Sequence, residues 1–101
     1  MLISSQKYLN DEIVEEKRLA RDYCVTVSPE FEIDGVVMQV ITDGHHSMAA
    51  ALSDGVEPEF SVCTVSEDDR MALIETSIDD FLIACWIDSD YYDFATGNPV
   101  F

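Results

Sequence analysis

Basic residues are scarce in this chain, and their scarcity excludes a large class of functions. The 101 residues include only five Lys and Arg against 21 Asp and Glu, which gives a net charge of −16. Proteins that bind nucleic acid normally need cations to neutralise the phosphates. We therefore expect that this chain does not bind DNA or RNA directly.

Other absences narrow the class of protein further. No apolar run approaches the roughly 20 residues that a membrane helix needs, and the N-terminus lacks the basic-then-apolar pattern of a secretory signal. We therefore expect a cytoplasmic protein without membrane contacts. The cysteines Cys24, Cys63 and Cys85 form no CxxC pair, which argues against a structural zinc site. Each lies in an apolar stretch, so we expect buried, reduced thiols.

The negative charge is concentrated in one part of the chain. Residues 1–21 balance four acids with four bases, whereas residues 22–101 contain seventeen acids and a single base, Arg70. Such an excess keeps a small protein soluble. It can also imitate a polyanion and occupy the cationic groove of another protein. A third interpretation is that the acidic surface binds metal ions. The composition leaves these three interpretations open.

Hydrophobic residues make up 48% of the sequence, which is enough to bury a core. The length predicts a single domain, residues 1–101. We divide it into an N-terminal helical segment at residues 1–21, a core at 22–65, and C-terminal helices with a tail at 66–101. The alternation of strand-like and helix-like segments predicts an α+β fold.

The local patterns predict most elements of this fold. Asn10 or Asp11 can cap a helix of about residues 11–21. Asp34-Gly35 between two β-rich runs predicts a hairpin turn. The following run, residues 36–41, predicts a central strand buried on both faces. Further predictions are strands at 23–27, 31–33 and 60–65, and helices at 45–53, after residues 66–69 and after Ser77. The expected core residues are Val40, Ile41, Ala50, Leu52, Val62, Leu73, Phe81 and Trp86.

The segment that joins the central strand to the next helix is the most informative. Residues 42–51 read Thr-Asp-Gly-His-His-Ser-Met-Ala-Ala-Ala, which predicts a strand end, a tight turn and a helix N-terminus. A helix N-terminus has unpaired N–H groups and about half a positive charge, so it can hold an anion such as phosphate. Two histidines on such a turn can bind phosphate, bind a metal or move a proton.

Structural roles explain the same residues equally well. His45 and His46 are adjacent and point about 100° apart on a helix, so one can cap or pack while the other is solvated. Asp43 can cap the helix instead of acting as a base, or bind a divalent metal together with a histidine. The acids at residues 88–93 lack the glycine and bidentate glutamate of a calcium loop, which favours a solvated turn.

The order of these features has a counterpart in a known superfamily. The features are Gly35 in the hairpin, Val40-Ile41 in the strand, Asp43-Gly44-His45-His46 in the turn, Ala49-Ala50-Ala51 in the helix, Gly55 at its end, and Pro58 before a strand at 60–63. This order, over roughly residues 22–65, resembles the ParB/sulfiredoxin-like fold. In that superfamily a hairpin ends in a Gly-x-x-Arg turn, and an Ala-rich helix, a Gly and a Pro-led strand follow.

The resemblance implies a β-hairpin and a short mixed sheet packed by three to four helices. It also implies a nucleotide- or phosphate-handling enzyme, such as an NTPase, kinase or nuclease, with a nucleotide and a divalent metal as cofactors. His45 or His46 would be the general acid/base or a phosphate ligand, Asp43 an orienter or metal ligand, and Gly44 and Ser47 part of the phosphate-binding turn. The family arginine that contacts nucleotide phosphates falls on Ser47. The nucleophilic cysteine of sulfiredoxins falls on His45, which excludes sulfiredoxin chemistry.

Two functions therefore compete. The first is a small acidic inhibitor of the phage or mobile-element type, similar in kind to anti-restriction and anti-CRISPR proteins. It would need no cofactor and would use a degenerate ParB-like scaffold to block the basic surface of a nucleic-acid-binding partner. The second is the ParB-like enzyme, which Ser47 and the acidic field disfavour. The residues expected to contact a partner are Glu57, Glu59, Glu67, Asp68, Asp69, Asp79, Asp80, Asp88, Asp90, Tyr91, Tyr92 and Asp93. The sequence leaves the oligomeric state open.

Overall fold

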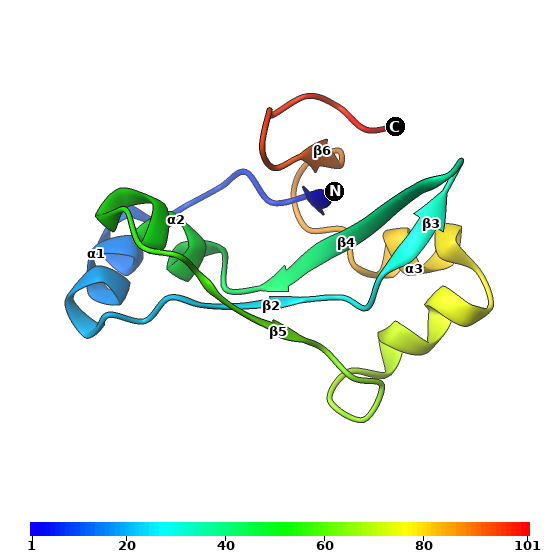
Figure 1. The fold of residues 1–101 in the computed structure, drawn as a ribbon, viewed down its shortest axis with the longest axis horizontal. Helices are drawn as coiled ribbons and strands as arrows, with labels where there is room; N and C mark the ends of the chain where they lie inside the picture. Colours follow the sequence, from blue (N-terminus) through cyan, green and yellow to red (C-terminus); the bar gives the residue numbers. More distant parts are fainter.

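A six-stranded mixed sheet organises the fold in the computed structural model, which describes all residues 1–101 (Figure 1). The strands run in the order β5-β2-β4-β1-β6, and β3 also pairs with β4. The α+β class and the mixed sheet with its hairpin and four helices confirm the coarse prediction. The strands are β1 (Leu2–Ser4), β2 (Cys24–Val27), β3 (Phe31–Ile33), β4 (Val36–Asp43), β5 (Glu59–Val62) and β6 (Tyr92–Asp93). The helices are α1 (Asp11–Ala20), α2 (His45–Asp54), the 3₁₀ helix η1 (Asp69–Glu75) and α3 (Ile78–Ala84).

The hairpin of β3 and β4 forms as predicted. Asp34 and Gly35 have φ angles of +52° and +82°, the left-handed pair that a tight hairpin turn requires. β4 is central, because it pairs with β2 and β3 in antiparallel and with β1 in parallel orientation. However, Val36 and Val37 are exposed, so the prediction that the whole run is buried on both faces is wrong. The tip of the hairpin lies at the end of the molecule away from α1 and α2 (Figure 1).

Two short strands escaped prediction. β1 pairs with β4 and places Ile3 beside Val40, and β6 pairs with β1 in antiparallel orientation. The N-terminal segment, expected to be helical, therefore also contributes a strand to the sheet, and so does the C-terminal tail. Unlike β3, neither segment shows the alternation of apolar and polar residues that identifies a strand in a sequence.

The helices α1 and α2 pack side by side in parallel orientation (Figure 1). The side chain of Asn10 caps α1 by accepting from the N–H groups of Glu12 and Ile13, as predicted. At the start of the pair the Asn10 N–H donates to His46 Nε2 across 3.1 Å. At the other end Arg18 Nε donates to Asp54 Oδ1 across 2.7 Å. None of the helices has both the length and the hydrophobicity to cross a membrane.

Two hydrophobic clusters stabilise the sheet. The predicted core residues Val40, Ile41, Ala50 and Phe81 are buried, and Leu73 packs half-buried against the larger cluster. The same prediction is wrong for Leu52, Val62 and Trp86, which are exposed. Their elements leave those sides uncovered, since β5 is an edge strand and Trp86 follows the end of α3. The larger cluster is Ile3, Phe31, Met38, Val40, Cys63, Met71, Phe81, Cys85 and Tyr91, and the smaller is Val25, Val27, Ile41 and Met48.

The second half of the chain differs from its prediction in detail. β5 begins at Glu59 and ends at Val62, where a longer strand was expected. The helix after residues 66–69 is the 3₁₀ helix η1, and Asp68 caps it. Cys63 and Cys85 are buried as expected, but Cys24 is exposed on β2 and its thiol donates to Glu59 Oε2 across 3.4 Å. The expectation of a buried thiol is therefore wrong for Cys24.

Candidate functional site

A polar pocket of about 500 Å³ lies where β4 ends and α2 begins. The predicted residues Asp43, Gly44, His45, His46 and Ser47, which we call the histidine turn, all line this pocket. α1, the segment before β2, and β2 itself complete its walls, because α1 packs on α2 and β2 pairs with the end of β4. The remaining lining residues are Gln6, Lys17, Asp22, Cys24, Thr26 and Thr42.

Gly44 allows the chain to pass directly from β4 into α2. Its φ angle is +89°, and a Cβ atom added there would lie 2.5 Å from the carbonyl oxygen of Cys24. Only glycine tolerates both this backbone conformation and this close approach of β2. Asp43 accepts from the Gly44 N–H across 2.8 Å, and no side chain caps α2. The expectation that Asp43 caps the helix is therefore wrong.

His45 is buried, and its imidazole faces the sheet. A hydrogen bond of 2.7 Å joins its Nε2 to the hydroxyl of Ser4 on β1. Burial lowers the pKa of His45 below its usual value, against a smaller opposing effect of the Asp43 carboxylate. The side chain is therefore neutral at pH 7 and attaches α2 to the sheet.

His46 points toward α1 and is half-buried. Its Nε2 accepts the N–H of Asn10 across 3.1 Å. Both histidines thus bind other parts of the chain. The structural interpretation expected one histidine to pack or cap and the other to be solvated. The packing role fits His45, whereas His46 is half-buried and hydrogen-bonded and is not the solvated side chain that was expected.

A carboxylate of the protein itself binds the side chains that were predicted to bind phosphate. The hydroxyl of Ser47 donates to Asp22 Oδ1 across 3.3 Å, and Lys17 Nζ donates to Asp22 Oδ2 across 3.0 Å. The hydrogen bond from Lys17 is the main cause that lowers the pKa of Asp22. Lys17 is the one basic side chain that lines the pocket, so both the hydroxyl and the cation that could bind a phosphate already bind Asp22. No group of three His, Cys, Asp or Glu side chains is arranged to hold a metal ion.

The acids predicted to contact a partner lie in several places. Glu57 and Glu59 lie before and on β5, and residues 88–93 lie between α3 and the tail. The largest group surrounds η1 and α3, which pack on each other at the opposite end of the molecule from α1 (Figure 1). We call residues 66–85 the acidic lobe. It contains Glu67, Asp68, Asp69, Glu75, Asp79 and Asp80.

Some of these acids have structural roles. Asp68 caps η1 and pairs with Arg70 across 2.6 Å, and this hydrogen bond lowers the pKa of its carboxyl. Glu67 accepts from the N–H and the hydroxyl of Thr64. Asp88 accepts from the N–H of Lys7, and Asp93 accepts from the tail. The carboxylates that form no hydrogen bond or ion pair within the protein are, among the predicted contacts, those of Glu57, Asp69, Asp79, Asp80 and Asp90.

The two tyrosines predicted to contact a partner differ in burial. Tyr91 is buried in the larger core cluster, and its hydroxyl donates to the carbonyl oxygen of Leu82 across 2.6 Å. Tyr92 is half-buried, its hydroxyl donates to the carbonyl oxygen of Gln6, and Lys7 lies over its ring. The burial of Tyr91 disagrees with its predicted role as the anchor for a partner, whereas Tyr92 is partly exposed and its contact with a partner stays a prediction.

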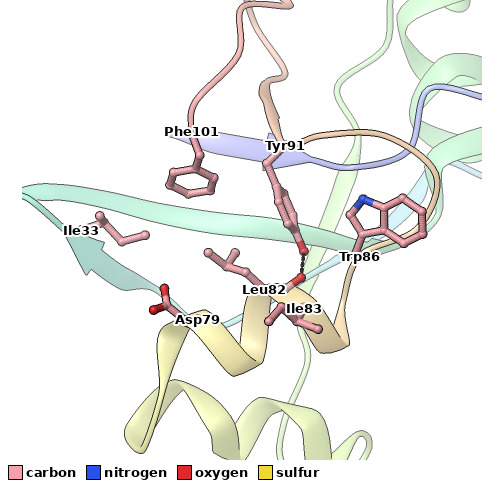
Figure 2. Close-up of a pocket in the computed structure, with 7 residues that line it drawn as sticks. All are labelled: Ile33, Asp79, Leu82, Ile83, Trp86, Tyr91 and Phe101. Carbon is pink, nitrogen blue, oxygen red and sulfur yellow. Dashed lines mark hydrogen bonds between the residues drawn. The ribbon is translucent and has the colours of Figure 1, made fainter.

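An apolar groove of about 680 Å³ next to the acidic lobe was missed by sequence reasoning (Figure 2). The sequence placed Trp86 in the core together with Phe81, so it did not indicate an exposed apolar surface here. The sequence of a helix does not reveal whether another element covers its face. The groove is lined by Ile33, Asp79, Leu82, Ile83, Trp86, Tyr91 and Phe101.

No protein-family model, no curated protein and no solved structure matches this chain. The geometry and charge described above are therefore the basis for a proposed function.

Proposed function

We propose that this protein is an acidic inhibitor that binds the cationic, nucleic-acid-binding surface of another protein. The observation that carries the proposal is the state of its charges. After residue 21 the single base is Arg70, and Asp68 neutralises it. The other ion pairs, Lys17–Asp22, Arg18–Glu15 and Arg18–Asp54, all involve bases of α1. The acidic lobe therefore presents carboxylates that lack an internal partner, and a basic groove would supply one.

The scaffold of this inhibitor, in our proposal, is a degenerate ParB/sulfiredoxin-like domain. The arrangement of β4, Gly44 and the Ala-rich α2 supports the relationship, as does the hairpin at Gly35. Ser47 at the arginine position, bound to Asp22, supports the loss of phosphate binding. An acidic protein of this kind fits a phage or mobile element that must inactivate a host nuclease.

The second candidate is a ParB-like enzyme that handles a nucleotide with a divalent metal. The polar pocket favours it, because Asp43, His45 and His46 line one cavity. Against it, His45 is buried and neutral, His46 Nε2 accepts from Asn10, and Lys17 binds Asp22. A site that must attract a polyanionic nucleotide would also work against the charge of the whole chain.

The test is capture of partners from a bacterial lysate fraction enriched for nucleic-acid-binding proteins on DNA-cellulose. We expect the immobilised protein to retain a basic protein, and duplex DNA to compete for it. Added salt should release it, because screening acts within about 8 Å at physiological ionic strength. If the immobilised protein retains nothing that DNA can displace, the proposal is wrong.

The matched variants compare two charge reversals of equal size. Asp69→Lys with Asp80→Lys changes the acidic lobe at two free carboxylates, whereas Glu12→Lys with Glu16→Lys changes exposed positions on α1. Both pairs should keep the fold, because exposed substitutions usually cost less than about 0.5 kcal/mol. The first pair should abolish capture and the second should retain it. Equal capture by both would show that the charge acts only on solubility.

A further inference from the structure

We propose that the apolar groove beside α3 binds a cationic amphipathic helix of the partner. The inference rests on the proposed function, and it adds to it the surface that gives specificity and the kind of segment that this surface recognises. Charge alone attracts many basic proteins, whereas an apolar groove selects those with a matching apolar face.

One wall of the groove is a single stripe of α3 and the residues that follow it. Asp79, Leu82 and Ile83 are spaced i, i+3 and i+4 on α3, so they lie on one side of this helix. Trp86, which follows the end of α3, also lines the groove. Ile33 from the hairpin and Phe101 from the tail form the opposite wall (Figure 2). An amphipathic helix can fill an apolar groove of this kind with anchors at its own positions i, i+3, i+4 and i+7.

Three apolar side chains that line the groove are largely exposed to solvent. Ile83 is 75% exposed, Trp86 54% and Phe101 60%. Tyr91 forms the floor of the groove beneath them. Its ring packs edge-to-face against that of Phe101, with 6.0 Å between the ring centroids, and its hydroxyl donates to the carbonyl oxygen of Leu82. These two contacts hold the floor in place. Single exposed apolar residues are ordinary, but several around one depression mark a binding surface.

The charges around the groove indicate that its occupant is positively charged. Asp79 is the one charged residue that lines it, and Asp80 and Asp69 of the same lobe are also free. The guanidinium of Arg70 binds Asp68 and the carbonyl oxygen of Ala84, so it does not offset them. An occupant must therefore have an apolar face for Ile83 and Trp86, and a Lys or Arg near Asp79.

The probe is a set of three tryptophan-free peptides of about 18 residues, long enough for five helical turns. The first consists of Lys and Leu with Leu at helical spacing, the second is its scrambled form, and the third replaces Lys with Glu. Trp86 is the single tryptophan of the chain, so its emission reports on the groove. We expect the first peptide to shift this emission to the blue and to protect Trp86 from acrylamide, and the other two to do neither.

A matched pair of variants localises the binding. Ile83→Ser should reduce the affinity for the first peptide by about tenfold or more, which is the loss expected when an anchor residue is removed. Leu19→Ser on α1 replaces an equally exposed aliphatic residue, at 78%, and should leave its affinity unchanged. Equal binding of the helical and scrambled peptides, or equal effects of the two substitutions, would overturn the inference.

Two further outcomes separate this inference from the proposed function. One outcome is that the Ile83→Ser variant retains a partner that DNA displaces, while the variant with Lys at positions 69 and 80 loses it. In that case the groove inference fails and the inhibitor function stands. If no such partner exists but the peptide results hold, the function fails and the groove still binds cationic helices. A dimer in analytical ultracentrifugation that Ile83→Ser converts to a monomer would make a second copy the occupant and overturn the proposal.

Discussion

The hydroxyl of Ser47 donates to Asp22 Oδ1 across 3.3 Å, at the position where the superfamily that this chain resembles has an arginine. Asp22 also binds Lys17 and accepts the N–H of Cys24. One carboxylate thus binds both the lysine of the pocket and the hydroxyl of Ser47. The polar pocket is stabilised by its own internal anion, and a bound phosphate would have to displace it.

The first prediction concerns nucleotides. We expect ATP, CTP and inorganic phosphate, with or without Mg²⁺, to leave the melting temperature unchanged, because Asp22 already binds Ser47 and Lys17. A ligand at a hundred times its Kd would otherwise stabilise the native state by about 2.7 kcal/mol. Differential scanning fluorimetry measures the shift.

Two variants decide how a negative result is interpreted. Asp22→Asn removes the internal negative charge, so it is the variant in which phosphate affinity should reappear. Lys17→Ala removes the basic side chain of the pocket. A nucleotide-dependent rise in the wild type that disappears in Lys17→Ala, or nucleotide turnover by the purified protein, would favour the enzyme over the inhibitor.

The second prediction compares two glycines that both have positive φ angles. Gly44→Ala places a Cβ atom 2.5 Å from the Cys24 carbonyl oxygen and 2.9 Å from Val25 Cα, whereas Gly35→Ala meets nothing within 4 Å. Gly35→Ala should cost only the strain of a left-handed residue, about 1–2 kcal/mol. Gly44→Ala should cost more, because β2 and α2 must also separate. Urea unfolding of both variants measures the difference, and equal losses would mean that α2 shifts freely.

The third prediction separates structural acids from available ones. Asp68→Ala removes the cap of η1 and the partner of Arg70, and loss of a cap costs about 0.5–2 kcal/mol. The neighbouring Asp69→Ala removes a carboxylate that binds nothing in the protein, and should stay within about 0.5 kcal/mol. Chemical denaturation at pH 7 checks both. Equal losses would show that Asp69 also stabilises the lobe, and would make it unsuitable for the charge-reversal test.

The sequence was sufficient for elements whose signals are local. Asn10 before α1, Asp34-Gly35 in the hairpin, Gly55 after α2 and Ser77 before α3 all lie where cap and turn preferences placed them. Each acts on its own neighbours, so its role is evident without knowledge of the fold. β1 and β6 were missed because their stability comes from β4 and from each other, which lie far away in the sequence.

Burial and the surface were harder to predict because they depend on which sides of an element the fold covers. Leu52 and Trp86 have the helical spacing of core residues but are exposed. Tyr91 was expected to contact a partner but is buried in the core. The histidine turn was located correctly from the sequence, but the contact between Ser47 and Asp22 joins residues 25 positions apart. No local pattern reports such a contact.

The last prediction concerns His45 and pH. Burial holds the pKa of His45 below its usual value of 6.5 in the folded protein. Between the folded pKa and about 6.5, the unfolded chain therefore binds more protons than the native state, and the free energy of unfolding rises with pH. The stability associated with neutral His45 is fully present above pH 6.5 and declines as the pH falls below it. His45→Gln, which cannot be protonated, should remove this decline.

Urea unfolding at intervals from pH 7.5 to 5.5 measures the slope in both proteins. The carboxyls of Asp22, Asp54 and Asp68 do not interfere, because their pKa values lie below the usual 3.8. The stability that those three contribute is lost only in more acidic solution, as the pH falls through their folded pKa values. A slope that persists unchanged in His45→Gln would mean that another group causes it and that His45 contributes nothing to the dependence of stability on pH.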